Sequence, residues 1–284
     1  MTTVDAHHHL LDPARRSYPW LAGDEMTPIR RPFGVEALRA VTDAAGIDRT
    51  VVVQTIASAE ETHEFLGLAA ASRGLVAGVV GWTDLEDPGV EEAIARMRAH
   101  PGGGRLVGVR HVVHDEEDPC WLRRPAVLRG LAAVGRERLV YDLLIRDREL
   151  PAAVATVREL PDQAFVVDHM AKPALRNGDL GRWSDGLRAL AAAPNVYCKL
   201  SGLVTEADWS SWRVDDLQPA VDAVLDWFGP DRMLFGSDWP VCLLAAGYEA
   251  WVDTAREMIS SLTHDEQARI MGRTATAVYG LAAA

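Results

Sequence analysis

Cysteine is scarce in this chain of 284 residues: Cys120, Cys198 and Cys242 are widely spaced, and no CxxC pair occurs. So few cysteines, odd in number, fit a reducing compartment and exclude a thiolate zinc site. Long apolar runs are lacking too, since none approaches the roughly 18 residues of a membrane helix. The chain also does not begin with a basic segment followed by an apolar one, which is the pattern of a secretory signal. We therefore expect a cytoplasmic protein that has no membrane partner.

Positive charge is the second deficit. The 29 lysines and arginines are outnumbered by 41 aspartates and glutamates, which gives a formal net charge of −12. Nucleic acid is excluded as a partner, because binding phosphates needs clustered lysine and arginine. Apolar residues, in contrast, make up 48% of the chain, enough for a large core. α/β barrels routinely reach this length as one domain. The sequence leaves open whether the protein is a monomer or a homo-oligomer.

Eight short runs rich in β-branched residues each predict a strand. They are Val4–His9, Thr50–Gln54, Val76–Trp82, Leu106–His111, Leu139–Leu144, Ala164–His169, Val196–Leu200 and Met233–Gly236. Segments with helical periodicity lie between most of them, namely Gly89–His100, Ala126–Val134, Glu149–Leu160 and Leu217–Phe228. This alternation predicts parallel βαβ units, and eight units with strands apolar on both faces favour a (β/α)8 TIM-like barrel over an open doubly wound sheet. We expect one α/β domain over residues 1–284, with extra C-terminal helices from Tyr248 onward that complete the outer ring.

The first strand carries three consecutive histidines in Val4-Asp5-Ala6-His7-His8-His9. Because successive side chains on a strand alternate faces, His7 and His9 share one face. Two imidazoles placed in this way can bind one metal ion or one carbonyl oxygen. A purification tag is an alternative, but a tag is followed by a linker rather than by an apolar pair such as Leu10-Leu11. Ordinary core histidines are a further alternative, here and for His169.

Polar residues stand at the ends of nearly all the predicted strands, where a barrel core alone would want Val, Ile or Leu. In such a barrel the chemistry lies at the C-terminal rim, where strands end and βα loops begin. In chain order the strands deliver His7 and His9, Gln54, Trp82, Arg110 and His111, then Asp168, His169 and Lys172, Lys199 and Ser201, and finally Asp238 and Trp239. We expect these side chains to form one site.

Several of these residues have plainer alternatives. Asp238 has the alternative of capping the next element, although its place after an apolar strand favours a buried carboxylate that needs a cation or donor. Arg110, on an otherwise apolar strand, must have an anion or several acceptors as partners. Lys199 has the alternative of a structural pairing with a nearby acid. For Gln54 and Trp82, a packing role and a ligand contact are about equally supported.

A long connection, Leu10–Pro32, follows the first strand and carries Trp20. Loops of this length are usually lids or binding loops. It also contains four arginines, which are Arg15, Arg16, Arg30 and Arg31. The remaining histidines in helical or loop segments are expected to be solvated surface groups, namely His63, His100, His114 and His264.

Several motifs together resemble the amidohydrolase superfamily. They are Asp5-Ala6-His7-His8-His9, Val167-Asp168-His169 with Lys172-Pro173, and Phe235-Gly236-Ser237-Asp238-Trp239-Pro240. The similarity is closest to its lactonase branch (amidohydrolase-related family 2), which includes L-fuconolactone and L-rhamnonolactone hydrolases and 2-pyrone-4,6-dicarboxylate lactonase. Three further motifs also resemble that branch: Gly81-Trp82-Thr83-Asp84-Leu85, Gly108-Val109-Arg110-His111 and Asn195–Gly202. A lone HxH would be weak evidence, but these motifs in this order are strong together.

The resemblance implies a TIM-like barrel and hydrolysis at a ring ester. Carried over residue by residue, His7, His9 and His169 would surround the carbonyl or a metal ion, and Asp238 would activate the water. The residues of a second metal site are missing, so a binuclear centre is not expected. A single Zn²⁺ held by these four residues and a metal-free site are both open. The carbonyl is then polarised either by imidazole donors or by the ion.

Substrate choice depends on the charges near the rim. A dicarboxylate lactone requires clustered cations, whereas Asp115-Glu116-Glu117-Asp118 after the fourth strand has the opposite sign, and only the arginines of the first loop could compensate. A neutral sugar aldonolactone needs hydrogen-bonding groups and an aromatic platform. The candidates are Arg110, Lys172, Gln54, Trp20, Trp82 and Trp239. We expect a sugar lactonase, with a zinc-dependent decarboxylase of a related branch or a non-catalytic sugar-binding barrel as alternatives.

Overall fold

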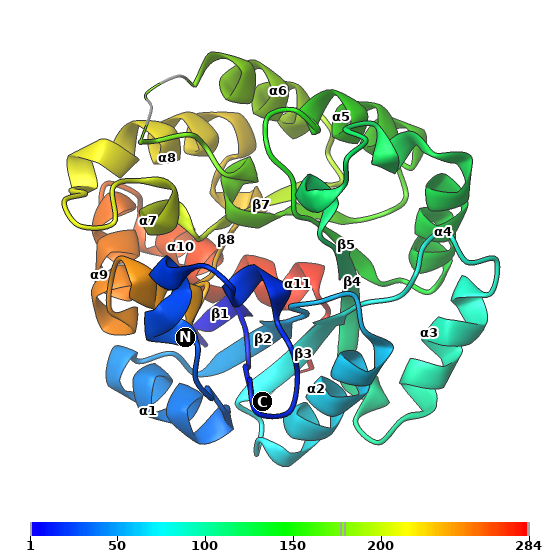
Figure 1. Cartoon of the computed structure of the whole chain (residues 1–284). Coiled ribbons are helices and arrows are strands. Elements are labelled where there is room, and N and C mark those ends of the chain that lie inside the picture. Colours follow the sequence, from blue (N-terminus) through cyan, green and yellow to red (C-terminus); the bar gives the residue numbers. More distant parts are fainter. Residues whose placement is uncertain (1, 177, 179, 283–284) are drawn as a thin grey trace.

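A computed structural model describes residues 2–176, 178 and 180–282 of the chain. Eight parallel strands form one sheet whose spatial order is the chain order. The strands are β1 (Val4–His8), β2 (Arg49–Val53), β3 (Val76–Gly81), β4 (Leu106–His111), β5 (Val140–Leu143), β6 (Phe165–Val167), β7 (Val196–Leu200) and β8 (Met233–Phe235). A parallel bridge between His8 and Trp239 joins the two ends of the series. The strands thus surround a central axis, with the helices outside them (Figure 1).

The helices follow the strands around the ring. They are α1 (Val35–Ala45), α2 (Ala59–Ala71), α3 (Val90–Ala99), α4 (Pro125–Arg136), α5 (Leu150–Glu159), α6 (Gly181–Ala191), α7 (Leu203–Glu206), α8 (Val214–Phe228), α9 (Tyr248–Met258), α10 (His264–Ala268) and α11 (Thr274–Val278). The (β/α)8 fold class expected from the sequence is confirmed, and the domain limits 1–284 stay a prediction. A helix with the length and hydropathy needed to cross a bilayer is absent from the described part of the chain.

The strands separate two apolar clusters, because their side chains alternate between the barrel interior and the surrounding helices. On β2, Val52 belongs to the outer cluster, which contains most of the helix side chains. Its neighbours Val51 and Val53 belong to the smaller inner cluster. Strands buried on both faces explain why the sequence shows continuous apolar runs rather than alternation.

The C-terminal segment differs in part from the expectation. Helix α9 packs against α1 and α8 in the outer ring, and Thr263 and Glu266 form the capping box that begins α10. Beyond α11, however, Tyr279 and Leu281 belong to the inner cluster, and the Tyr279 hydroxyl donates to Asp142 inside the barrel at 2.8 Å. Tyr279 and Leu281, together with Ala275 of α11, therefore fill part of the barrel interior.

Candidate active site

The end of β1 and the residue after it aim two of three consecutive histidines, His7 and His9, into one place. The backbone N–H of His9 donates to the Trp239 carbonyl at 2.6 Å, and that of Asp238 donates to the His7 carbonyl at 2.7 Å, so the ends of β1 and β8 are tied together. The imidazoles of His7 and His9 approach each other at 3.3 Å between their Nε2 atoms. His8 points the other way, with its Nε2 2.9 Å from Thr50 Oγ1. The alternation expected for a strand thus holds at the site.

His169 arrives on unusual backbone. His169, Met170, Ala171 and Lys172 all have φ between 52° and 56°, and Asp238 has φ 57°. Each left-handed residue other than glycine costs about 1–2 kcal/mol, so the surrounding structure must hold this turn in place. The turn also explains why β6 ends at Val167 rather than at His169 as the sequence suggested. Strained backbone at three of the expected site residues, His169, Lys172 and Asp238, favours a functional origin for all three.

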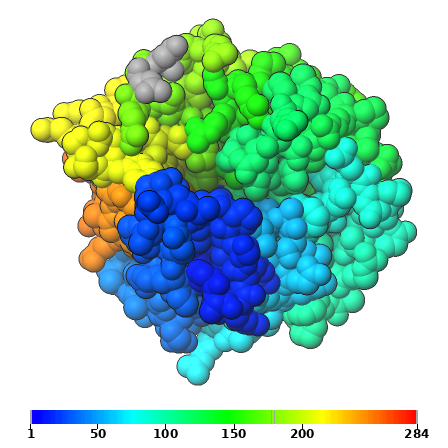
Figure 2. All heavy atoms as spheres, viewed as in Figure 1, coloured from blue at the N-terminus to red at the C-terminus, as the bar shows by residue number. Residues whose placement is uncertain are grey.

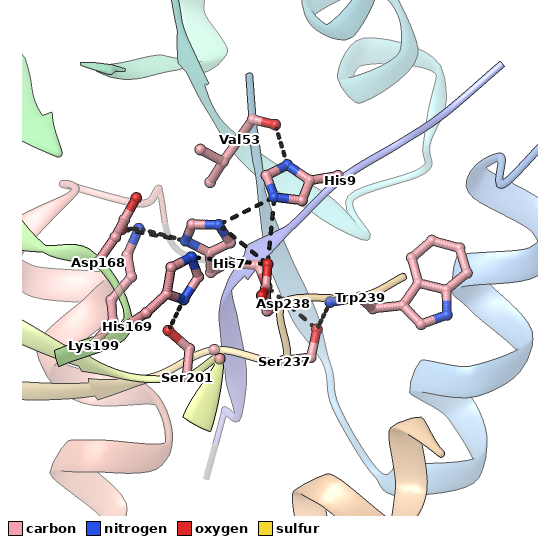
Figure 3. Close-up of polar contacts among 12 residues, drawn as sticks. His7, His9, Val53, Asp168, His169, Lys199, Ser201, Ser237, Asp238 and Trp239 are labelled. Carbon is pink, nitrogen blue, oxygen red and sulfur yellow. Dashed lines mark hydrogen bonds and ion pairs between the residues drawn. The ribbon is translucent and has the colours of Figure 1, made fainter. Parts of the chain in front are cut away.

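The four expected ligands meet at a common centre (Figure 3). Asp238 Oδ1 lies 3.4 Å from His9 Nε2, 3.7 Å from His7 Nε2 and 3.9 Å from His169 Nε2. Tetrahedral Zn²⁺ with Zn–N bonds of about 2.0–2.1 Å has ligand atoms ~3.3 Å apart. Two groups of residues that share His7 have the spacing of a metal site. The first is His7, His9 and Asp238, and the second is His7, Asp168 and His169. The residues present therefore fit one divalent ion.

Each imidazole is held through its other nitrogen. His9 Nδ1 lies 2.8 Å from the Val53 carbonyl, His7 Nδ1 lies 3.2 Å from Asp168 Oδ1, and His169 Nδ1 lies 2.9 Å from Ser201 Oγ. A carbonyl only accepts hydrogen bonds, so Nδ1 of His9 carries the proton and its Nε2 offers its lone pair. His7 Nδ1 lies 3.2 Å from Asp168 Oδ1 and also 3.2 Å from Lys199 Nζ, which donates. This pattern of oriented imidazoles is typical of metal ligands.

Beneath the imidazoles lies a buried network of charges. Asp168 pairs with Arg110 at 2.9 Å and with Lys199 at 2.8 Å, and Lys199 also pairs with Asp142 at 2.6 Å. Burial alone would raise the pKa of Asp168, but Lys199 and His7 outweigh burial and hold that pKa well below its usual range. Burial raises the pKa of Asp142 to about 6 against the opposing charge of Lys199. The structural pairing considered for Lys199 is therefore present.

The electrostatics favour neutral imidazoles facing a charged carboxylate. Burial lowers the pKa of His7 and His169 well below the usual range, and nearby carboxylates offset this only in part. Burial would raise the pKa of Asp238, but its close contacts with His169 and His9 outweigh burial, so the pKa of Asp238 lies below its usual range. Uncharged nitrogen lone pairs beside one carboxylate form a ligand set suited to a divalent cation.

A cavity of about 260 Å³ opens above this centre. His9, His169, Asp238, Arg110 and Lys172 line it together with Thr55, Val112, His114, Asp115, Leu144 and Val241. The remaining lining residues, Trp20 and Met26, come from the first loop, which lies in blue across the middle of this face (Figure 2). The long Leu10–Pro32 connection thus forms one wall of the cavity.

Two polar atoms of the lining are buried without a partner among the described residues: Trp20 Nε1 and His114 Nδ1. The expectation that His114 is a solvated surface group was wrong, since its side chain is only 16% exposed. Burial and then the positive charge of Lys172 lower its pKa to about 3. Sequence reasoning missed it because a loop histidine has no periodic signal. Unpaired buried polar atoms beside a cavity are places where a ligand can bond.

Other expected contact residues lie behind the lining. Gln54 accepts from Arg110 through Oε1 at 2.9 Å, Trp82 Nε1 donates to His111 Nδ1 at 3.1 Å, and Trp239 packs edge-on against Phe33. None of these three expected residues is in the described lining of the cavity. Their contact with a substrate stays a prediction, and the contacts described above are all with protein neighbours.

Arg110 lines the cavity, yet its donors are engaged by protein acceptors. Its Nε and Nη2 bond to Gln54, including the backbone carbonyl, and its Nη1 reaches Asp168 and lies 3.4 Å from His7 Nε2. A guanidinium has five N–H groups, so little of this capacity is left for a ligand. The anion and acceptors that Arg110 was expected to need are thus Asp168 and Gln54.

The four arginines of the first loop contact protein groups in or beside that loop. Arg15 and Arg16 pair with Glu64 at 2.8 Å and 3.0 Å, Arg30 donates to the Leu21 carbonyl, and Arg31 lies over the Phe33 ring. Among the residues that the structure describes, none of these arginines lines the cavity. The cations that a dicarboxylate lactone would need are therefore not supplied by this loop.

The fold and site together define a (β/α)8 barrel with one three-histidine, one-aspartate centre at its C-terminal rim. The amidohydrolase family profile matches residues 4–281, and the chain belongs to this family. It is 39% identical to an L-fucono-1,5-lactonase of Burkholderia multivorans, over 98% of this chain and 96% of that protein. It is 36% identical to an L-fucono-1,5-lactonase of Burkholderia ambifaria, over 97% and 94% of the two chains.

A solved structure shows the same architecture with an ion. The crystal structure of an amidohydrolase from Burkholderia multivorans with bound zinc is 37% identical to this chain and superimposes with a TM-score of 0.93. The match covers 99% of this chain and 100% of that one. The amidohydrolase resemblance inferred from the motifs is therefore confirmed, and so is the expectation of an enzyme.

Proposed function

We propose that this protein hydrolyses the ring ester of a neutral sugar lactone, an aldonolactone such as an L-fucono-1,5-lactone. The observation that carries the proposal is the convergence of three imidazole Nε2 atoms on Asp238 Oδ1 within 3.4–3.9 Å, beneath a cavity of about 260 Å³. The similarity to two L-fucono-1,5-lactonases supports the substrate class.

We assign the centre to one divalent ion, zinc, held by His7, His9, His169 and Asp238. The tautomer of His9 favours the ion over the metal-free alternative, since its Nε2 offers a lone pair and has no proton to donate to a carbonyl oxygen. When bound, the ion supplies Lewis-acid polarisation and lowers the pKa of a bound water.

Asp238 is the proposed general base. The three imidazole Nε2 atoms lie against Oδ1 of Asp238, and Asp238 lines the cavity, so we assign the proton transfer to Oδ2. In the proposed reaction a water oxygen attacks the lactone carbonyl carbon while Oδ2 accepts the water proton. The bond from that carbon to the ring oxygen then breaks, and Asp238 returns the proton to the leaving ring oxygen. The product is the open hydroxy acid.

The lining favours a neutral, hydroxylated ring. Lys172 forms an ion pair with Glu206, with Nζ 2.7 Å from Oε1, and Arg110 forms one with Asp168. The unpaired Trp20 Nε1 and His114 Nδ1 match hydroxyl groups, which both donate and accept. A substrate with two carboxylates would require cations that these pairings already neutralise.

A lactone panel on the zinc-loaded protein tests the proposal, with acid release followed by a pH indicator. L-fucono-1,5-lactone and related aldonolactones should turn over, while 2-pyrone-4,6-dicarboxylate and a 2,6-dihydroxybenzoate should not. Turnover of the dihydroxybenzoate with carbon dioxide release would instead establish the decarboxylase. Binding of lactones without any turnover would establish the non-catalytic barrel. A cytoplasmic location and a homo-oligomer stay predictions.

A further inference from the structure

A second cavity, of about 670 Å³, lies at the opposite end of the barrel. Arg49 begins β2 and Arg105 directly precedes β4, so the cavity lies at the N-terminal ends of the strands, away from the candidate active site. Arg39 and Arg73 also line it. The two carboxylates of its lining are Asp43 and Asp48.

Positive charge gathers here although the chain as a whole carries a net charge of −12. Ion pairs among the described residues use other arginines, for example Arg146 with Glu206 and Arg256 with Asp253. Asp48 bonds instead to the Thr3 backbone and hydroxyl, at 2.7 Å and 2.9 Å. The four lining guanidinium groups thus have no carboxylate partner within 4.0 Å in the described ranges.

Arg49 is a buried cation whose charge costs free energy unless an anion binds beside it. Arg49 is only 7% exposed, and its one side-chain hydrogen bond among the described residues joins Nη1 to the Ala282 carbonyl. Burial, and then the nearby positive charge of Arg105, lower the pKa of Arg49. A buried cation beside a like charge normally requires an anion.

Most donors of the cluster remain available. Within the described ranges, Arg39 and Arg105 each have a single side-chain hydrogen bond, to the Ser72 and Ala77 carbonyls respectively. Arg73 has none among the described residues, and it stands on left-handed backbone with φ 56°. Each guanidinium has five N–H groups in a planar fork that matches paired oxygens of carboxylate or phosphate.

We propose that this cluster, Arg39, Arg49, Arg73 and Arg105, is a binding site for a small divalent oxyanion that carries phosphate or paired carboxylate oxygens. The anion neutralises Arg49 and Arg105 and accepts hydrogen bonds from Arg73 and Arg39. Charge-assisted bonds to guanidinium are the strong class of hydrogen bond. The site is separate from the lactone cavity, so it does not depend on the proposed function.

Titration calorimetry on the full zinc-loaded chain at low ionic strength tests this, with inorganic phosphate and succinate as probes and sodium chloride at matched ionic strength as the blank. The two probes distinguish a phosphate source from a carboxylate source. We expect one site per chain, and Arg73→Gln with Arg105→Gln should weaken binding at least about tenfold. Arg158→Gln, an exposed arginine on α5, is the matched control and should bind as the parent does.

Three outcomes would overturn the proposal. They are heats equal to the chloride blank up to about 10 mM probe, unchanged binding in the double variant, and loss of binding in Lys172→Met instead, which would place the anion in the lactone cavity. If the double variant fails to fold, phenylglyoxal modification of the parent gives the answer. Phosphate or succinate should then protect Arg73 and Arg105 but leave Arg158 reactive, and equal labelling with and without probe refutes the site.

Discussion

Replacing Asp168 by asparagine separates the orienting carboxylate from the ligand set. Asp168→Asn keeps the size of the side chain and removes the charge that faces His7 Nδ1 at 3.2 Å, Lys199 Nζ at 2.8 Å and Arg110 Nη1 at 2.9 Å. The proposed zinc ligands themselves stay in place. We expect both the stability of the fold and the affinity for zinc to fall, for two different physical reasons.

The stability loss follows from the two cations left behind. Breaking a buried ion pair by removing one partner costs about 3–5 kcal/mol. Lys199 keeps Asp142 as a partner at 2.6 Å, so the loss in free energy of unfolding should lie near the lower end, about 3 kcal/mol. Removing a carboxylate that orients a metal-binding imidazole typically weakens metal affinity about 10–100-fold.

The two quantities are measured separately. Urea unfolding of the zinc-free protein gives the free energy of unfolding, and competition with a chelating dye gives the zinc affinity. Asp142→Asn is the matched control, because Asp142 is equally buried and pairs with the same Lys199 but does not touch an imidazole. Since the pKa of Asp142 is already raised to about 6, neutralising it should cost less stability and leave zinc affinity unchanged.

Zinc affinity in Asp168→Asn within about threefold of the parent would refute the orienting role, because the expected loss is at least about tenfold. Equal losses of zinc affinity in Asp168→Asn and Asp142→Asn would show instead that zinc binding depends on the total charge of the buried network.

Asp238→Asn should retain the fold by circular dichroism but lose most lactone turnover, and turnover within about tenfold of the parent would identify another group as the base, since general base catalysis contributes about 10²–10⁴-fold. Elemental analysis after gel filtration should return at most one divalent ion per chain, and two equivalents would contradict the single centre. Trp20→Phe keeps the aromatic ring but removes the indole donor, so KM for the sugar lactone should rise several-fold at constant kcat, whereas a loss of kcat alone would be inconsistent with a substrate-binding role. Burial would raise the pKa of Glu206, but the charges of Lys172 and Arg146 outweigh it and lower that pKa. Ionised Glu206 therefore stabilises the fold above the unfolded-state pKa of a glutamate, and this contribution is lost as pH falls through the lower folded-state pKa. Unfolding midpoints from neutral to acid pH should show a shallower decline for Glu206→Gln, and parallel declines would exclude the pairing as a source of acid sensitivity.

Local sequence patterns were sufficient to predict the architecture and the proposed ligands. The periodicity of apolar residues specifies a strand or a helix through geometry that acts within a few residues. The HxH pattern at the end of β1 places His7 and His9 together because side chains alternate along an extended chain. The other ligands follow from topology, since parallel strands bring the residues after β6 and β8 to the same rim as those of β1.

Contacts between side chains of distant strands could not be predicted from the sequence. Whether Arg110 had free donors depended on Asp168 and Gln54, which lie 58 and 56 residues away in the chain. Trp20 was expected from the long first loop, whereas His114 became a cavity residue only because its loop folds over the same centre.

The same limit applies to the backbone turn and to the arginine cluster. The sequence Asp168-His169-Met170-Ala171-Lys172 contains no glycine to announce left-handed backbone, and tertiary packing imposes it. Arg39, Arg49, Arg73 and Arg105 are spread over separate elements and gather only when the barrel closes. Sequence by itself determined which segments are strands and helices and which rim residues can do chemistry. Tertiary structure decided which charges are neutralised and which remain available, because pairing depends on distances of a few ångströms between groups that no local pattern connects.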